Sequence, residues 1–170
     1  MRVLLDGVGS DDLAGLLLAA LAPRPVARVP ADGFLRPAGE RFEHGREDAE
    51  ALRTTWLDAA ALQREVLEPA PAGSYLPALR DAERDRSVRL PPQPLPGGAV
   101  LVVDGRFLLD RGLPAELTVH VALSAAALRR RGVPEWQLPA FAEYAPAARA
   151  TCDVLVLAED PRRPAVVLPD

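Results

Sequence analysis

Short apolar runs alternate with helical segments along this chain, and this alternation limits the choice of fold more than any other feature. The clearest run is AVLVV, residues 99–103, which is followed by Asp104 and Gly105. Runs of this kind are typical of strands in a parallel sheet that helices cover on both faces. Further strands are predicted at residues 3–6, 25–34 (where the strand runs into a loop), 117–123, 152–158 and 165–169.

Helical spacing predicts the segments between these strands. Asp58 is the expected N-cap of one helix, and Pro69 ends that helix. Residues 70–98 are proline-rich and the least regular, so we expect an irregular hairpin or a flexible excursion there. The chain has 170 residues, 49% of them hydrophobic, which predicts a single α/β domain over residues 1–170. The helices are predicted at residues 11–21, 48–56, 57–69, 124–132 and 138–150.

The opening sequence RVLLDGVGSDDLAG has the layout of a phosphate-binding loop: an apolar strand, a glycine turn and the start of a helix. Such a loop normally reads G-x-x-x-x-G-K-[ST], and its lysine reaches the outer phosphates of a nucleotide. Here Gly7 and Gly9 are followed by Ser10, Asp11 and Asp12. All 20 basic residues of the chain are arginine, so no lysine from elsewhere in the sequence can replace the missing one.

Asp11 and Asp12 can be interpreted in two ways. In the first, they belong to the capped start of the helix, with Ser10 or Asp11 as the N-cap, and the positive end of the helix dipole stabilises their negative charge. In the second, they serve metal binding or catalysis. We favour capping. In that case a phosphate about 6 Å from a carboxylate is disfavoured by about 3 kcal/mol at an effective dielectric constant of about 20. ATP is therefore expected to bind very weakly in the usual position.

Several segments, taken in order, resemble the uridine kinase-like branch of the P-loop kinases, and together they cover nearly the whole chain. The resemblance implies a three-layer P-loop kinase fold with a mostly parallel five-stranded sheet. Against the family's pattern, the opening loop lacks about three residues, including the G-K-[ST] core. What remains of the cofactor-binding loop is Gly7, Gly9 and Ser10. The segments that carry the resemblance are RVLLDG (entering the phosphate loop), ADGFLRP with RFEHGRED (after the second strand), LDAAALQREVLEP (the next helix), AVLVVDGRFLL (the Walker B strand), LRRRG with EWQLPAFAEY (the lid and the following helix) and CDVLVLAEDPRRP (the last strand and tail).

The resemblance implies substrate-binding roles for residues that follow the second strand. Asp32 would face the sugar hydroxyl and accept its proton as the catalytic base, but an aspartate before a glycine is also common in turns. Phe34 would stack on a base or fill the core. Arg41 and Arg46 would hold a sugar or a phosphate, or they belong to a solvated loop.

The resemblance also implies roles at the end of the clearest strand and in the lid. Asp104 would help to hold Mg²⁺, or it is an ancestral site residue that no longer binds a metal. Arg129 and Arg130 would stabilise charge on the transferred phosphoryl group together with Arg131, or the three form a solvated basic helix end. His120 alternates with valines, so we expect it on a face of the sheet.

Composition limits the class of partner and the cellular location. The formal net charge of -4 argues against nucleic acid or a membrane surface as the main partner. The single cysteine allows no intrachain disulfide, and no apolar run approaches transmembrane length. We therefore expect a cytoplasmic protein.

Taken together, these features predict a degenerate nucleoside kinase-like protein: a pseudokinase without ATP phosphotransfer that keeps a small-molecule or protein-binding role. No cofactor is expected. One alternative is an active nucleoside or small-alcohol kinase with a non-standard phosphate site, which would use ATP and Mg²⁺. Another is a repurposed enzyme that uses the nucleoside-type crevice for other chemistry. The expected partner is a nucleoside-like small molecule or a protein, and no oligomeric state is predicted.

Overall fold

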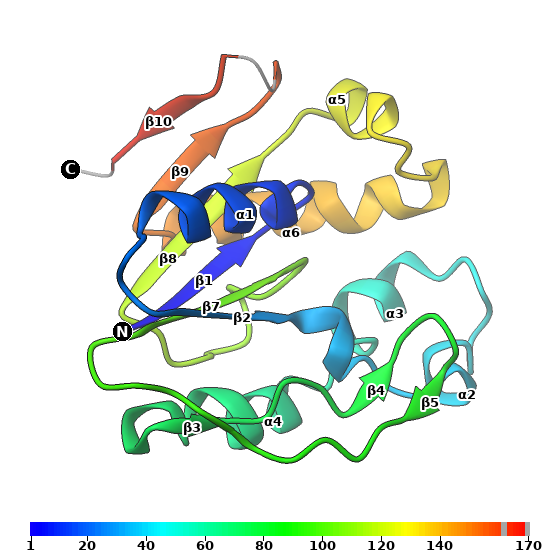
Figure 1. Cartoon of the computed structure of the whole chain (residues 1–170). Helices are drawn as coiled ribbons and strands as arrows, with labels where there is room; N and C mark the ends of the chain where they lie inside the picture. Colours follow the sequence, from blue (N-terminus) through cyan, green and yellow to red (C-terminus); the bar gives the residue numbers. More distant parts are fainter. Residues whose placement is uncertain (161–162, 169–170) are drawn as a thin grey trace.

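The computed structural model describes residues 1–160 and 163–168, and its centre is a six-stranded sheet in the order β10-β9-β8-β1-β7-β2 (Figure 1). Neighbouring strands are parallel except for β10, which runs antiparallel to β9. The mostly parallel sheet is thus confirmed, and its strand count is corrected from five to six. The strands are β1 (Arg2–Asp6), β2 (Val26–Pro30), β7 (Val100–Gly105), β8 (Leu117–Ala122), β9 (Val154–Leu157) and β10 (Ala165–Val167).

The sixth strand comes from the last predicted strand, residues 165–169. Pro169 lies outside the described residues, as do Pro161 and Arg162 in the tail segment that carries part of the resemblance. Within the predicted segment 25–34, the strand β2 ends at Pro30, and the part that was expected to be a loop forms a 3-10 turn over residues 31–34.

Helices connect the strands and mostly follow the predicted segments. Asp58 accepts a hydrogen bond from Ala61 N at 2.9 Å, which confirms it as an N-cap. Pro146 lies inside α6 without ending it. The helices are α1 (Ser10–Ala20), α2 (Ala38–Arg41), α3 (Ala49–Thr54), α4 (Ala59–Leu62), α5 (Ala125–Arg130) and α6 (Leu138–Thr151), with the 3-10 turns η1 (Ala31–Phe34), η3 (Ala70–Ala72) and η4 (Glu135–Gln137) and a π-helical turn η2 (Gln63–Leu67) that continues α4.

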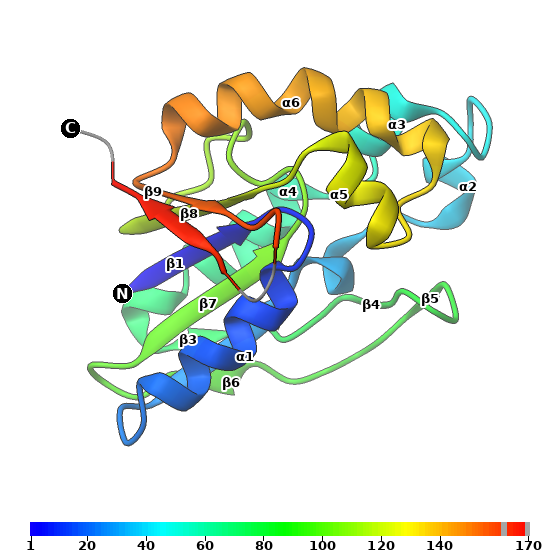
Figure 2. The same cartoon turned by 90° about the horizontal axis from the view of Figure 1, so that it is seen from above.

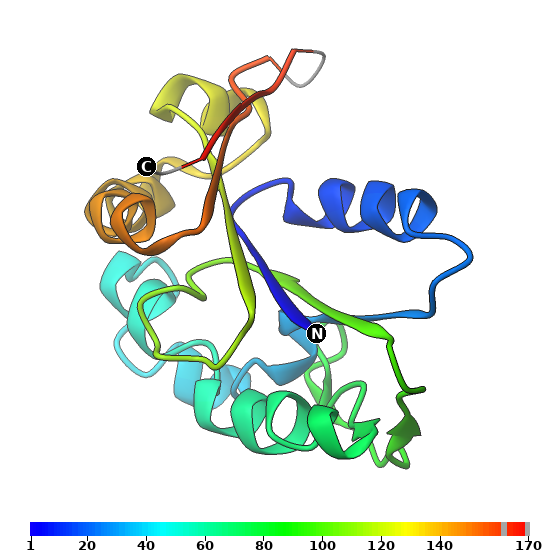
Figure 3. The same ribbon diagram turned by 90° about the vertical axis from the view of Figure 1, so that its left-hand side faces the viewer.

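The elements form three layers, with α1 on one face of the sheet and α3, α4 and α6 on the other (Figures 2 and 3). The side chains of the central strand β1 alternate between the two faces. Val3 and Leu5 pack in the cluster that contains Ala14 of α1, and Leu4 packs in the cluster that contains Leu62 of α4. Both clusters are buried, so the central strands are covered on both sides, as a parallel sheet requires.

Residues 70–98 form two short antiparallel ladders against the α4 side of the molecule. The strands are β3 (Ser74–Tyr75) with β6 (Gln93–Pro94), and β4 (Arg80–Asp81) with β5 (Arg86–Ser87). The segment is anchored by Leu95, which is buried in the main core. Of the two expectations for this segment, the structure supports the irregular hairpin. Among the described residues, no helix is long and apolar enough to cross a membrane.

Candidate active site at the carboxyl ends of the strands

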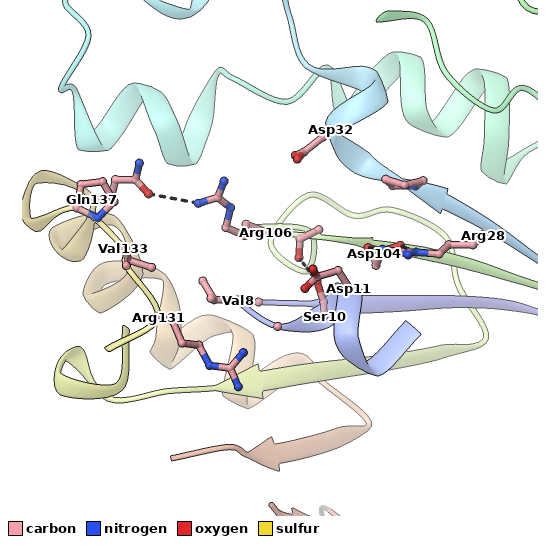
Figure 4. A pocket seen from close by; sticks show the side chains of 16 residues that line it. Val8, Ser10, Asp11, Arg28, Asp32, Asp104, Arg106, Arg131, Val133 and Gln137 are labelled. Carbon is pink, nitrogen blue, oxygen red and sulfur yellow. Dashed lines mark hydrogen bonds and ion pairs between the residues drawn. The ribbon is translucent and has the colours of Figure 1, made fainter. Parts of the chain in front are cut away.

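A cavity of about 600 Å³ opens at the carboxyl ends of β1, β2 and β7 (Figure 4). Its wall is completed by the start of α1 and by the segment between α5 and α6. In open parallel α/β sheets this edge is where ligands bind. The charged side chains that line the cavity are Arg28, Arg106, Arg131, Asp11, Asp32 and Asp104.

The loop between β1 and α1 consists only of residues 7–9. Gly7 has a φ of 112°, and a Cβ atom there would lie 2.5 Å from the carbonyl oxygen of Val121. Gly9 has a φ of 90° and is the N-cap of α1. Both positions therefore require glycine. The G-x-x-x-x-G spacing of a phosphate-binding loop is longer than this whole connection.

The start of α1 differs from the predicted cap. The N-cap is Gly9 and not Ser10 or Asp11, and no side chain caps the helix. Ser10 is buried, and its hydroxyl donates to the carbonyl of Gly105 at 3.4 Å. Asp11 and Asp12 lie in the first helical turn, where the helix dipole favours their negative charge. Asp12 also pairs with Arg131 at 3.6 Å.

Asp104 is paired with Arg28, a residue that the sequence analysis missed. The Nε and Nη2 atoms of Arg28 donate to Oδ1 and Oδ2 of Asp104, each at 2.7 Å. The two residues lie on adjacent strands, and Asp104 is only 4% exposed. This bond holds the pKa of Arg28 above its usual value. An arginine within an otherwise apolar strand was the signal that could have identified the pair.

The residues around Asp104 do not fit a magnesium site. Both carboxylate oxygens already accept hydrogen bonds from the guanidinium group of Arg28. At about 4 Å and an effective dielectric constant of about 20, a divalent ion gains about 8 kcal/mol from a carboxylate and loses as much to a guanidinium group. The Arg28–Asp104 pair therefore has no net electrostatic attraction for a divalent metal ion. Within residues 1–160 and 163–168, no group of three acidic, histidine or cysteine side chains is placed to hold a metal.

Asp32 lies in η1 and points into the cavity (Figure 4). Its side chain is exposed, and it has no hydrogen-bond or ion-pair partner among the described residues. Asp32 and Asp104 line the same cavity. Asp32 and Arg106 also line a second, adjoining pocket of about 200 Å³.

The other predicted substrate-binding residues lie in different places. Arg41 lines the second pocket, where its guanidinium lies 5.3 Å from the ring centroid of Trp56 and pairs with Asp85 at 3.2 Å. Of the two roles considered for Phe34, the structure agrees with the core, because the residue is 1% exposed and packs in the main core. Arg46 is exposed beside Phe42 and lines neither the cavity nor the second pocket.

We call residues 129–137 the lid, and only one of its three arginines faces the cavity. Arg129 pairs with Glu135 at 2.6 Å, and Arg130 donates to the carbonyl of Glu159 at 3.1 Å. The structure thus turns both predicted catalytic arginines away from the cavity. Arg131 lines the cavity instead (Figure 4). Its guanidinium lies against Gly9.

A buried polar cluster fixes the base of the glycine loop. Asp6, which directly precedes Gly7, has no exposed surface. Its Oδ1 accepts a hydrogen bond from Leu108 N at 2.8 Å, and its Oδ2 lies 2.6 Å from His120 Nδ1. The ring of Tyr144 packs against His120, and burial raises the pKa of Tyr144, so its hydroxyl stays neutral. The structure confirms His120 as a residue of the sheet and adds its partner.

Comparisons with known proteins bear on the fold. No family model matches the chain, and no curated protein sequence matches it. A solved structure of a possible uridine kinase from Bacillus stearothermophilus superposes with a TM-score of 0.72 and 18% identity, covering 91% of this chain and 87% of that chain. A candidate fructose transport system kinase from Silicibacter sp. TM1040 superposes with a TM-score of 0.57 and 21% identity, covering 89% and 85%.

These similarities define the class of fold. The chain has a P-loop kinase-like α/β fold, with its cavity at the edge of the sheet where such folds bind ligands. Within that class, the fold is uridine kinase-like. At these identities the likeness concerns the fold alone, and the chemistry has to be argued from the residues of the cavity.

Proposed function

We propose that this protein is a kinase-like binding protein that has lost ATP-dependent phosphoryl transfer. The observation that carries the proposal is the three-residue connection at residues 7–9, which runs directly into the acidic turn of Asp11 and Asp12. A phosphate chain needs a wide nest of backbone N–H groups and a compact positive charge. This connection is too short for such a nest, and the two aspartates place negative charge where the phosphates would lie.

Arg131 supports the proposal from the opposite wall of the cavity. Its guanidinium lies against Gly9 and pairs with Asp12, so it takes up space in front of the loop. A nucleotide in the usual position would have to displace this side chain and separate the pair. The loop and the acidic turn therefore act against binding of the nucleotide phosphates, and Arg131 can offset them only after it leaves Asp12 and Gly9.

The region around Asp32 supports a retained binding role. Its carboxylate is exposed and unpartnered among the described residues, and it lies where the larger cavity meets the second pocket. The second pocket has an aromatic wall that includes Trp56 and Phe107. A free carboxylate beside an aromatic pocket suits a small molecule with a hydroxyl group and a ring, so a nucleoside-like ligand is the class we propose.

One observation favours a second candidate, an active kinase whose phosphate site uses arginine. Arg28 and Arg131 both line the cavity and could in principle replace a lysine charge. Each is already paired with a carboxylate, Asp104 and Asp12 respectively. Arginine also lacks the compact point charge that lysine brings to such a site. The binding protein is therefore the better supported function.

A calorimetric titration with Mg-ATP tests the loss of nucleotide binding. We expect no saturation below millimolar concentration, which corresponds to a binding free energy weaker than about -4 kcal/mol. The double variant Asp11→Asn, Asp12→Asn separates the effect of the short loop from the effect of the two negative charges. If the short loop contributes, this variant also stays in the millimolar range, although the repelling charge is gone. A micromolar dissociation constant for the unaltered protein, together with phosphoryl transfer to any alcohol, would show that the proposal is wrong.

A thermal-shift panel of nucleosides and nucleoside monophosphates tests the retained pocket. We expect at least one compound to raise the melting temperature, and we expect Asp32→Ala to abolish that shift, because the carboxylate would accept the hydrogen bond of the sugar hydroxyl. Arg46→Gln is the matched control, since Arg46 lines neither pocket and should leave the shift unchanged. If no compound raises the melting temperature, a protein partner is favoured. If a compound still raises the melting temperature of Asp32→Ala, the ligand binds at a site other than the one around Asp32.

A further inference from the structure

We propose that the guanidinium group of Arg28 is a resident cation that excludes divalent metal ions from this cavity and makes the cavity independent of metal. The residue that the resemblance assigns to Mg²⁺ is Asp104. In this structure the same carboxylate is already bound by a positive group that the chain itself supplies. The inference concerns the cation beside Asp104 and goes beyond the proposed loss of ATP binding.

The geometry of the pair leaves Asp104 with little capacity for a metal. Arg28 approaches it as a fork, with Nε on Oδ1 and Nη2 on Oδ2, both at 2.7 Å. This arrangement is the strong bidentate form of an arginine–carboxylate interaction. Because Asp104 is 4% exposed, its carboxylate cannot turn outward to bind an ion in solvent while the pair persists.

The pair also lies in the right place to act on the cavity. Arg28 and Asp104 both line it, and the Arg28 side chain is 32% exposed while that of Asp104 is 5% exposed. The cavity therefore meets the guanidinium side of the pair more than the carboxylate side. Arginine stays protonated under all ordinary conditions, so this positive charge does not depend on pH or on the concentration of metal.

The remaining acidic groups do not form a replacement site. Asp11 and Asp32 line the same cavity, but they and Asp104 are not grouped as metal ligands in the part of the chain that the structure describes. Mg²⁺ in kinase-type sites is held by one or two carboxylates together with substrate phosphates. Here the carboxylate of Asp104 is neutralised by Arg28. A metal ion could bind Asp104 only after the guanidinium group of Arg28 had moved away from it.

Titration with Mn²⁺, followed by the electron paramagnetic resonance signal of the free ion, tests the inference. We expect the unaltered protein to bind no Mn²⁺ at this cavity up to about 1 mM. We expect Arg28→Gln to bind it at least about tenfold more tightly, because the substitution frees the carboxylate. The double variant Arg28→Gln, Asp104→Asn should lose the gained site. Arg24→Gln is the matched control, since it removes an arginine that does not line the cavity.

Two results would overturn the inference. One is a folded Arg28→Gln variant with the same Mn²⁺ affinity as the unaltered protein. The other is Mn²⁺ binding by the unaltered protein that Asp104→Asn abolishes. If Arg28→Gln does not fold, the comparison of the unaltered protein with Asp104→Asn decides, since we expect the two to bind Mn²⁺ equally weakly. None of these measurements uses a nucleotide, so their outcome is separate from that of the Mg-ATP titration.

Discussion

Replacing Asp6 with alanine is expected to lower the free energy of unfolding by about 3–5 kcal/mol. Asp6 is fully buried beneath the glycine loop, where it accepts a hydrogen bond from Leu108 N and lies 2.6 Å from His120 Nδ1. The substitution leaves a buried backbone N–H group and a buried imidazole without their partner. On folding, the Leu108 N–H group and the His120 imidazole lose their hydrogen bonds to water, and in the variant no hydrogen bond to Asp6 replaces them. Urea denaturation followed by circular dichroism measures the loss.

Two further variants show whether the effect comes from these contacts. Asp6→Asn keeps an oxygen for Leu108 N and should destabilise less than Asp6→Ala. Asp11→Asn changes an exposed aspartate in the same region and should shift stability by no more than about 0.5 kcal/mol. A loss below about 1 kcal/mol for Asp6→Ala would mean that the cluster contributes little to the fold.

The second large effect is expected for Phe34→Ala, with a loss of about 3–5 kcal/mol in the free energy of unfolding. Phe34 is 1% exposed and lies in the main core, next to the turn that carries Asp32. Removing its ring deletes buried apolar surface and leaves a cavity that the neighbouring strands cannot fill completely. Thermal and urea unfolding of the purified variant measure the loss.

Phe34→Leu serves as the control, because it keeps most of the buried volume and should destabilise less. Its ligand response in the thermal-shift panel should match that of the unaltered protein, since Phe34 lines neither pocket. An unchanged stability of Phe34→Ala together with a lost ligand response would instead place Phe34 in the binding site.

The sequence predicts the architecture well because the signals for it are local. An apolar run such as residues 99–103 and a helix start such as Asp58 depend on neighbours within a few positions, and both are found as predicted. The sixth strand was predicted as a segment, but its addition to the sheet was not. The sixth strand, β10, joins the sheet by pairing with β9. The residues of β10 alone do not indicate this partner.

The candidate site is less predictable because its contacts join distant parts of the chain. Arg28 and Asp104 are 76 positions apart, and their pairing follows from the register of β2 against β7. In the lid, three arginines stand in a row, and the sequence does not distinguish them; α5 ends at Arg130, and Arg131, the residue after it, lines the cavity. The cellular location and the partner remain predictions from the sequence.

The glycine loop and the lid both line the cavity, but they differ in how firmly their contacts hold them. We expect this difference to determine which of the two opens first. The base of the glycine loop rests on Asp6, whose contacts are buried, whereas the lid arginines pair with Glu135, Glu159 and Asp12, whose side chains are each more than half exposed. Exposed ion pairs contribute about 0–1 kcal/mol each and weaken as ionic strength rises. We therefore expect local opening to begin at the lid, while the buried Asp6 cluster stays closed until the whole domain unfolds. For the ligand class that we propose, we therefore expect the opening of the lid to set the exchange rate with solvent, and we expect salt to shorten the time that the ligand stays bound.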